Sequence, residues 1–186
     1  MSTALVISGS PSKTSKTERV ASHLVGRLAG EGHAAEHLRL RQLPPESLLA
    51  ADTSDPLLAN AVEQVEQADG IVLATPTYKA AYSGLLKLFL DLLPQFGFAG
   101  KAVLPLATGG TLAHVLALDY GLRPVVHSLG ARHVVQSFFL LDKHITVTGE
   151  DFAIHEDSAG PLEDVFQQFL KALAGVPHET VLGRKA

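Results

Sequence analysis

The sequence predicts one α/β domain in which a parallel five-stranded sheet carries helices on both faces. Apolar runs alternate with segments of helical periodicity five times along the 186 residues. Three of these runs are apolar on both faces, as is typical of parallel strands that are covered from both sides. The length suits a single domain. We expect this domain to span residues 1–175 and a loose tail to follow over residues 176–186.

The strands are predicted from short apolar or alternating segments that end at turn residues. Continuous apolar runs occur in ALVIS, GIVLATP and KAVLPLATGG, AAEHLRL alternates, and HVVQSFFL is the fifth such segment. The strands are expected at residues 4–8, 34–40, 70–76, 101–110 and 133–140. Five units of this kind fit a flavodoxin-like sheet with the strand order 2-1-3-4-5.

The helices are predicted from apolar residues at helical spacing and from signals at their ends. In the first helix Val20, Leu24 and Leu28 have this spacing, and Gly30 follows them. Ser83 is expected to cap the third helix. The helices are expected at residues 16–29, 55–68, 83–93, 112–129 and 162–174. The segment LPPES is expected to be a turn, and residues 142–159 are expected to form an excursion at the rim.

Composition excludes several classes of protein. The formal net charge of −4 argues against a nucleic-acid partner, which would require a basic face. The chain has no cysteine, so disulfides, thiol catalysis and cysteine metal sites are excluded. No apolar run has membrane-spanning length, and the first residues do not resemble a signal peptide. We therefore expect a cytoplasmic protein with no membrane partner.

Three turns rich in Gly, Ser, Thr and Pro follow strands that are neighbours in the predicted order. Ligands bind at this edge of such sheets. The first turn, SGSPSKTSKT, precedes a helix, whose free N–H groups and dipole favour an anion. Its spacing is close to that of a P-loop, but serine replaces both glycines and no strand ends in an aspartate for magnesium. The dinucleotide fingerprint G-x-G-x-x-G is also missing after the first strand.

A terminal phosphomonoester fits this first turn. Several hydroxyls can bond the dianion at once, and one lysine adds charge at the rim. The residues expected around the phosphate are Ser10, Ser12, Ser15, Lys16 and Thr17. The other two turns are TPTYKAAYSG and ATGGT. They can lie on either side of a planar ring, because the two glycines of ATGGT allow the backbone to approach a flat ligand closely. A phosphate site beside a ring site is what FMN requires.

Four segments together resemble the NAD(P)H-dependent FMN reductases, over roughly residues 4–135: SGSPSKTSKT, ATPTYKAAYSGLLKLFLDLLPQ, LPLATGG and HVLALDYGLRPVV. The most similar members are the flavodoxin-like reductases of two-component alkanesulfonate monooxygenase systems. The resemblance implies the same phosphate contacts, with lysine at position 16 where relatives often have arginine. It also implies residues along the isoalloxazine ring, which are Pro76, Thr77, Tyr78, Lys79, Thr108, Gly109 and Gly110.

The resemblance also implies an activity and an assembly. Hydride would pass from NADPH or NADH to FMN, and reduced FMN would be supplied to a partner monooxygenase. Homodimers or homotetramers are usual in the family. The segment with Tyr120 resembles a helix that carries a π-bulge at the tetramer contact, so Tyr120 is expected to influence flavin release. No other catalytic side chain is expected, because hydride transfer depends on positioning.

Two other functions stay open at this stage: an FMN-retaining quinone or azo reductase, and a flavodoxin-type electron carrier. The sequence assigns no metal ligands. HAAEH has the letters of a zinc motif, but that motif requires a helix, and here His33 and His37 border or lie on a predicted strand. The other histidines, including His144 and His155, are expected to be surface or capping groups.

Overall fold

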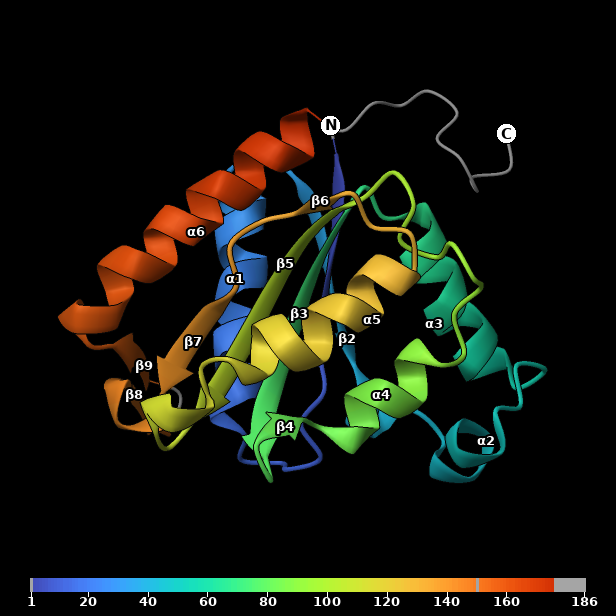
Figure 1. The fold of residues 1–186 in the computed structure, drawn as a ribbon, viewed down its shortest axis with the longest axis horizontal. Helices are drawn as coiled ribbons and strands as arrows, with labels where there is room; N and C mark the ends of the chain where they lie inside the picture. Colours follow the sequence, from blue (N-terminus) through green and yellow to red (C-terminus); the bar gives the residue numbers. More distant parts are fainter. Residues whose placement is uncertain (1, 150, 176–186) are drawn as a thin grey trace.

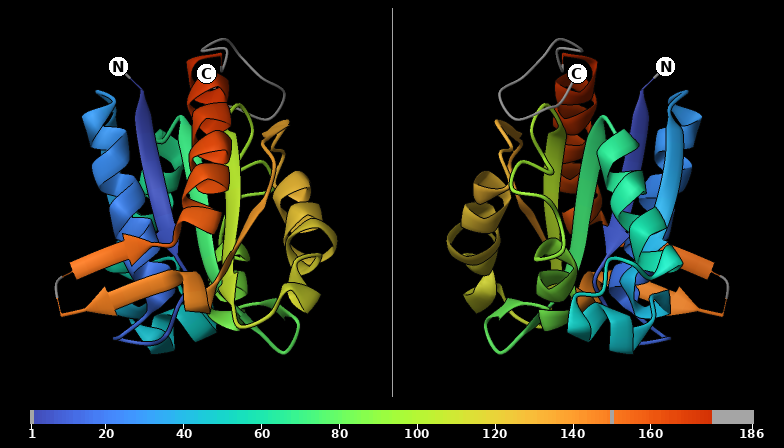
Figure 2. Two further views of the ribbon diagram at one scale, coloured as in Figure 1. Left: turned by 90° about the vertical axis from the view of Figure 1, so that its left-hand side faces the viewer. Right: turned by 90° about the vertical axis from the view of Figure 1, so that its right-hand side faces the viewer.

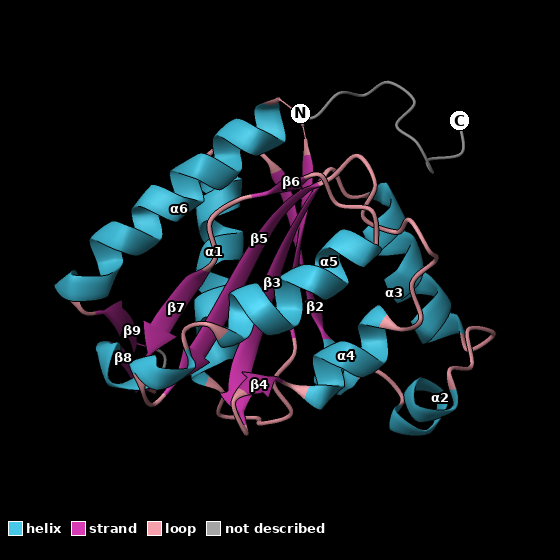
Figure 3. Ribbon diagram, viewed as in Figure 1, coloured by secondary structure: helices cyan, strands magenta, loops and turns pink. Residues whose placement is uncertain are grey.

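A twisted sheet forms the middle layer of the molecule, between two layers of helices (Figure 1; Figure 3). The computed structural model describes residues 2–149 and 151–175. The strands of the main sheet are β1 (Thr3–Ser8), β2 (Ala34–Arg39), β3 (Gly70–Tyr78), β4 (Ala81–Tyr82), β5 (Ala102–Gly109), β6 (His133–Val134) and β7 (Phe138–Leu141). The order β2-β1-β3-β5 continues with β6 and β7, which both pair with β5 in parallel. The predicted order is confirmed, with the fifth strand divided in two.

The α-helices are α1 (Lys16–Gly30), α2 (Pro45–Ala50), α3 (Pro56–Gln67), α4 (Gly84–Leu90), α5 (Arg123–Ser128) and α6 (Glu156–Ala174). Helices α1 and α6 pack on one face of the sheet, and α3, α4 and α5 pack on the other (Figure 2). The alternation of β1 explains this division, since Val6 joins the core under α1 and α6 while Leu5 and Ile7 join the opposite core. Among the described helices, none is both long enough and apolar enough to cross a bilayer.

Three expectations about the elements were wrong. LPPES contains the start of α2, because Pro45 at its first position suits a helix start. Helix α6 begins at Glu156 and not at residue 162, and it accommodates Pro161 inside. The helix expected over residues 112–129 is divided into a 3-10 turn η2 (Leu112–His114), a π-helix η3 (Leu118–Leu122) and α5. The tail expected over residues 176–186 lies outside the described residues.

The rim excursion expected at residues 142–159 is a 3-10 turn, η4 (Asp142–His144), followed by a β-hairpin. Its strands are β8 (Ile145–Thr148) and β9 (Asp151–Ile154), which pair with each other in an antiparallel register. The hairpin projects from the domain beside α1 (Figure 2). A further 3-10 turn, η1 (Leu40–Gln42), follows β2.

The break between β6 and β7 is stabilised by one arginine. The Arg123 guanidinium donates to the carbonyl oxygens of Val134 (3.3 Å) and Val135 (3.0 Å) and to the Ser137 hydroxyl (2.9 Å). Its Nε also lies 3.2 Å from a carboxylate oxygen of Asp119. The guanidinium thus supplies donors for two carbonyls at the point where the strand is interrupted.

Histidine 37 ties β2 to the neighbouring strand and helix. Its Nε2 lies 2.9 Å from the Ser8 hydroxyl, and its Nδ1 lies 3.3 Å from the Ser22 hydroxyl. Burial, reinforced by the Arg39 charge, lowers the pKa of His37 from 6.5 to about 4. The segment HAAEH runs into strand β2, as the sequence predicted. The lowered pKa keeps His37 neutral near pH 7.

We predict that this histidine makes the fold acid-sensitive. The unfolded chain binds a proton below pH 6.5, whereas folded His37 does so only near pH 4. The free energy of unfolding is therefore highest above pH 6.5 and should fall between these values by up to about 1.4 kcal/mol per pH unit. Urea titrations at several pH values measure this fall. It should be smaller in His37→Gln and unchanged in His133→Gln, an exposed control; equal falls in all three proteins would contradict the assignment.

Candidate functional site

Three turns meet at the edge formed by the carboxyl ends of β1, β3 and β5, at the bottom of Figure 1. They are the loop between β1 and α1, the β3–β4 hairpin, and the segment after β5. The sequence predicted this convergence, because neighbouring parallel strands end at the same edge. The predicted ligand residues lie on these turns or in the element ends beside them, with Lys16 and Thr17 in the first turn of α1 and Thr108 and Gly109 at the end of β5. Tyr120 lies apart from them on η3.

The first two turns are locked together by Ser83, which caps α4. Its hydroxyl donates to the Gly9 carbonyl (2.6 Å) and accepts from the Leu86 N–H (3.1 Å), while its own N–H donates to the Thr75 hydroxyl (2.9 Å). A Cβ at position 9 would lie 2.8 Å from Cβ of Leu86 and 3.0 Å from the Ser83 hydroxyl. Only glycine at position 9 lets α4 approach the end of β1 this closely.

The loop from Gly9 to Ser15 presents some of its hydroxyl groups to solvent. Ser10 is buried, but Ser12 and Thr14 are exposed. The bonds inside the loop are long: the Ser12 N–H donates to Ser10 Oγ at 3.3 Å, and the Thr14 N–H donates to Ser12 Oγ at 3.2 Å. Such weak internal bonds can be exchanged for bonds to an anion at small cost.

The other three predicted phosphate residues have partners within the protein. Ser15 caps α1, because its hydroxyl accepts from the Glu18 N–H at 3.1 Å. The Lys16 ammonium donates to the Asp142 carbonyl at 2.6 Å. Thr17 is buried, and its hydroxyl lies 2.7 Å from that of Thr108. The structure therefore leaves Ser12 and Thr14 as the accessible hydroxyls of this loop, and Thr14 was missing from the predicted set.

The second turn is a tight hairpin between β3 and β4. Tyr78 pairs with Ala81, so Lys79 and Ala80 form a two-residue loop with φ values of 50° and 63°. Positive φ at both positions is the geometry of a type I′ turn, which glycine or asparagine usually occupies. Because Lys79 and Ala80 both carry a Cβ, their positive φ values are strained, and this strain lies at the edge of the site.

One polar atom at this edge has no protein partner. The hydroxyl of Thr77 is buried and makes no hydrogen bond within the described part of the chain. Pro76 beside it is buried, whereas Tyr78 is 48% exposed. An orphaned buried hydroxyl is costly unless another molecule bonds to it, so it fits a polar ligand at this turn.

The glycines of the third turn have different roles. A Cβ at Gly109 would lie 2.7 Å from the ring of Phe139, so this glycine is required by packing inside the protein. A Cβ at Gly110 would meet no atom within 4 Å. Of the two glycines expected to allow close approach of a flat ligand, only Gly110 faces open space.

Tyr120 lies on the π-helix η3, where the resemblance placed a π-bulge. Its side chain is 78% exposed. Pro124 has no N–H to donate to the Tyr120 carbonyl, and the Arg123 N–H bonds the Leu118 carbonyl in the wider π pattern. A Cβ at the next residue, Gly121, would lie 3.6 Å from the ring of Tyr82 on β4. This places η3 directly against the β3–β4 hairpin.

The comparisons with known proteins agree with this geometry. A family model described as NADPH-dependent FMN reductase matches residues 2–146. The chain belongs to this family. The FMN reductase (NADPH) of Escherichia coli K12 is 44% identical to the reductase over 141 residues, which cover 76% of this chain and 74% of the relative. The NADH-dependent FMN reductase SfnE of Pseudomonas putida is 36% identical over 139 residues, which cover 70% of this chain and 74% of SfnE.

A solved structure also matches the fold of the reductase. The apo form of the NADH:FMN oxidoreductase EmoB is 42% identical and superposes with a TM-score of 0.84. The match covers 96% of this chain and 92% of the EmoB chain. The reductase is thus an NAD(P)H-dependent oxidoreductase with FMN and a pyridine nucleotide as its small-molecule substrates.

We predict that Gly109, the last residue of β5, and Gly110, which follows it, respond differently to alanine. Gly109→Ala should lower the free energy of unfolding by about 1–3 kcal/mol, because its methyl group collides with Phe139. Gly110→Ala should change it by less than about 0.5 kcal/mol. Urea denaturation of the two variants makes the comparison. A Gly109→Ala variant as stable as Gly110→Ala would show that Phe139 moves aside freely.

Proposed function

We propose that this reductase supplies reduced FMN to a flavin-dependent monooxygenase of organosulfur metabolism, with an alkanesulfonate as the class of final substrate. The observation that carries the proposal is the accessible hydroxyl loop beside two open turns at the carboxyl edge of the sheet. Such a site suits a flavin that enters, is reduced and leaves. Membership of the FMN reductase family supports the same interpretation.

The phosphate of FMN is assigned to the β1–α1 loop. The exposed hydroxyls of Ser12 and Thr14 and the N–H groups before α1 can donate to the dianion. Ser10 positions the loop through its bond to the Ser12 N–H. Lys16 contributes charge from the rim, but the Asp142 carbonyl already accepts from its ammonium. Ser15 and Thr17 act indirectly, by fixing the start of α1 and its contact with Thr108.

The isoalloxazine ring is assigned to the space between the second and third turns. The residues there fit a planar polar ring, since Thr77 offers an unpaired buried hydroxyl and Gly110 borders open space. Pro76 and the Tyr78–Lys79 backbone would flank the ring, and Thr108 and Gly109 would support Gly110. Bound FMN supplies an acceptor for hydride from the nicotinamide. The role of the chain is to orient the two rings face to face.

Loose binding of FMN follows from the same contacts. The phosphate loop contains no arginine, so it has no bidentate guanidinium to hold the dianion. The main hydroxyls are exposed, where water competes with them. A reductase that released its product would require such a site, whereas one that retained FMN for quinone or azo reduction would be expected to bury the phosphate.

Oxidation of NADPH and NADH by purified flavin-free protein tests the proposed function. We expect activity that depends on added FMN and rises with it, and transfer of reduced FMN to an alkanesulfonate monooxygenase present in the same assay. In a second sample, purified with whatever flavin it retains, turnover with quinone but no added FMN would support the FMN-retaining alternative. Reduced flavin that never reaches the monooxygenase would overturn the assignment of the partner.

The phosphate assignment predicts a selective loss of affinity. Ser12→Ala removes an exposed hydroxyl and should weaken FMN at least about tenfold, the cost of one charge-assisted hydrogen bond. Riboflavin, which lacks the phosphate, should bind almost as before. Flavin fluorescence quenching measures both affinities, and Ser128→Ala, an exposed serine on α5, is the control. Equal weakening of both flavins would contradict a phosphate site at this loop.

An assembly of two or four copies is proposed through the surface around η3. Large exposed apolar side chains gather on the hairpin and on the segment after β5, namely Tyr78, Leu112, Val115, Leu116 and Tyr120. Exposed apolar side chains that gather in one region favour a protein–protein interface there. Tyr120 would then lie at the contact and beside the flavin edge.

We predict that Tyr120→Ala shifts the sedimentation profile towards smaller species and changes FMN affinity, because the side chain is 78% exposed and supports no core. The melting temperature should change little. Leu49→Ala, at a side chain that is 74% exposed on α2, is the matched control and should leave all three properties unchanged. If Tyr120→Ala behaves like this control, Tyr120 has no part in assembly or flavin release.

A further inference from the structure

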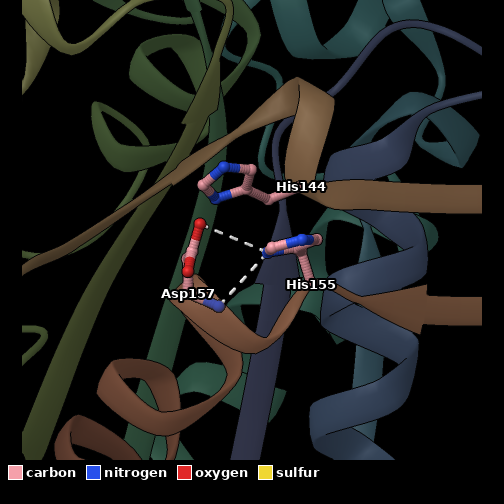
Figure 4. Close-up of side chains that lie close together, drawn as sticks. All are labelled: His144, His155 and Asp157. Atoms are coloured by element: carbon pink, nitrogen blue, oxygen red, sulfur yellow. Dashed lines mark hydrogen bonds and ion pairs between the residues drawn. The ribbon is translucent and has the colours of Figure 1, made fainter.

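Two histidines and an aspartate gather where the β8–β9 hairpin meets the start of α6 (Figure 4). They are His144, His155 and Asp157, and each offers one ligand atom within 4.8 Å of the other two. They lie outside the residues assigned to the flavin. The sequence suggested only surface or capping roles for these histidines, and His155 does cap α6.

The hairpin register holds the two imidazoles together. The His155 N–H donates to the His144 carbonyl at 2.8 Å, directly beside the paired residues Ile145 and Ile154. Opposed residues of an antiparallel pair place their side chains on the same face. The two rings accordingly stack, with centroids 5.2 Å apart and planes at 28°. Their proximity is thus set by the backbone.

The third ligand comes from the first turn of α6. A carboxylate oxygen of Asp157 lies 3.4 Å from Nδ1 of His155. In a tetrahedral zinc site with bonds of about 2.0–2.1 Å, neighbouring donor atoms are separated by about 3.3 Å. The pair already has this spacing, and because Nδ1 of His155 also accepts from the Asp157 N–H at 3.3 Å, the ion would replace that N–H as the partner of Nδ1. His155 and Asp157 are exposed, so small side-chain rotations can bring the three donors onto one ion.

A buried serine orients the remaining imidazole. The Ser158 hydroxyl lies 2.7 Å from Nδ1 of His144, and this serine is 6% exposed. A metal ion would take the second ring nitrogen or replace the hydroxyl as the partner of Nδ1. Hydrogen bonds of this kind from a second layer of residues are what hold metal-binding imidazoles in place.

We propose that His144, His155 and Asp157 bind a divalent transition-metal ion of the zinc class, with water at the open coordination position. A donor set of two imidazoles and one carboxylate favours zinc, whereas magnesium and calcium prefer oxygen donors alone. The positive end of the α6 dipole opposes a cation, but Glu156 and Asp157 in the first turn offset it. The ion would link the base of the hairpin to α6.

Zinc titration of untagged, flavin-free, chelator-treated protein tests this site. Calorimetry should show one equivalent bound with a micromolar or tighter dissociation constant, and zinc should raise the melting temperature. His155→Asn keeps a capping side chain but removes the imidazole, and Asp157→Asn keeps the shape but removes the charge. Each variant should bind zinc at least about tenfold more weakly.

His133→Asn, at an exposed histidine on β6, is the control and should bind zinc like the original protein. Cobalt gives a second readout, because its absorption bands should appear in the original protein and disappear in His155→Asn. The proposal is overturned if no zinc binds at millimolar concentration, or if the two cluster variants bind it as the control does. Since no flavin is present, the result is independent of the function proposed above.

Discussion

The hydroxyl of Ser83 fixes the distance between two of the three turns on which the site is built. It donates to the Gly9 carbonyl and accepts from the Leu86 N–H, and the same residue's N–H donates to Thr75. The Gly9 N–H also donates to the Ala74 carbonyl of β3 at 2.8 Å. These groups are buried, so breaking one leaves the others unsatisfied in a place that water does not reach. The other turns at this edge of the sheet are arranged around this rigid junction.

Rigidity and adaptability are divided along this edge. The junction at Ser83 and the buried pair of Thr17 and Thr108 join the ends of β1, β3 and β5 without using any exposed group. The loop residues Ser12 and Thr14 contribute only long internal bonds to the fold. Exchange of those bonds for a ligand therefore leaves the strand ends where they are. This division suits a protein that binds FMN as a substrate.

The features predicted from the sequence were those that depend on nearby residues. The sheet order, the Ser83 cap and the strand interpretation of HAAEH follow from local patterns and were confirmed. The partners of Lys16 and Thr17 were missed, because Asp142 and Thr108 are distant in the sequence and nothing local points to them. Pro161 concealed the true start of α6, and the gathering of His144, His155 and Asp157 depends on a hairpin register that the sequence pattern did not reveal.

The division of the outer strand into β6 and β7 has a consequence for self-adhesion. An unbroken parallel strand at the margin of a sheet offers a row of unpaired N–H and carbonyl groups, to which a strand of another molecule can add. Here the guanidinium of Arg123 already bonds the carbonyls of Val134 and Val135, and the remaining pieces are short. The same arginine that completes the fold thus makes this margin a poor template for edge-to-edge aggregation.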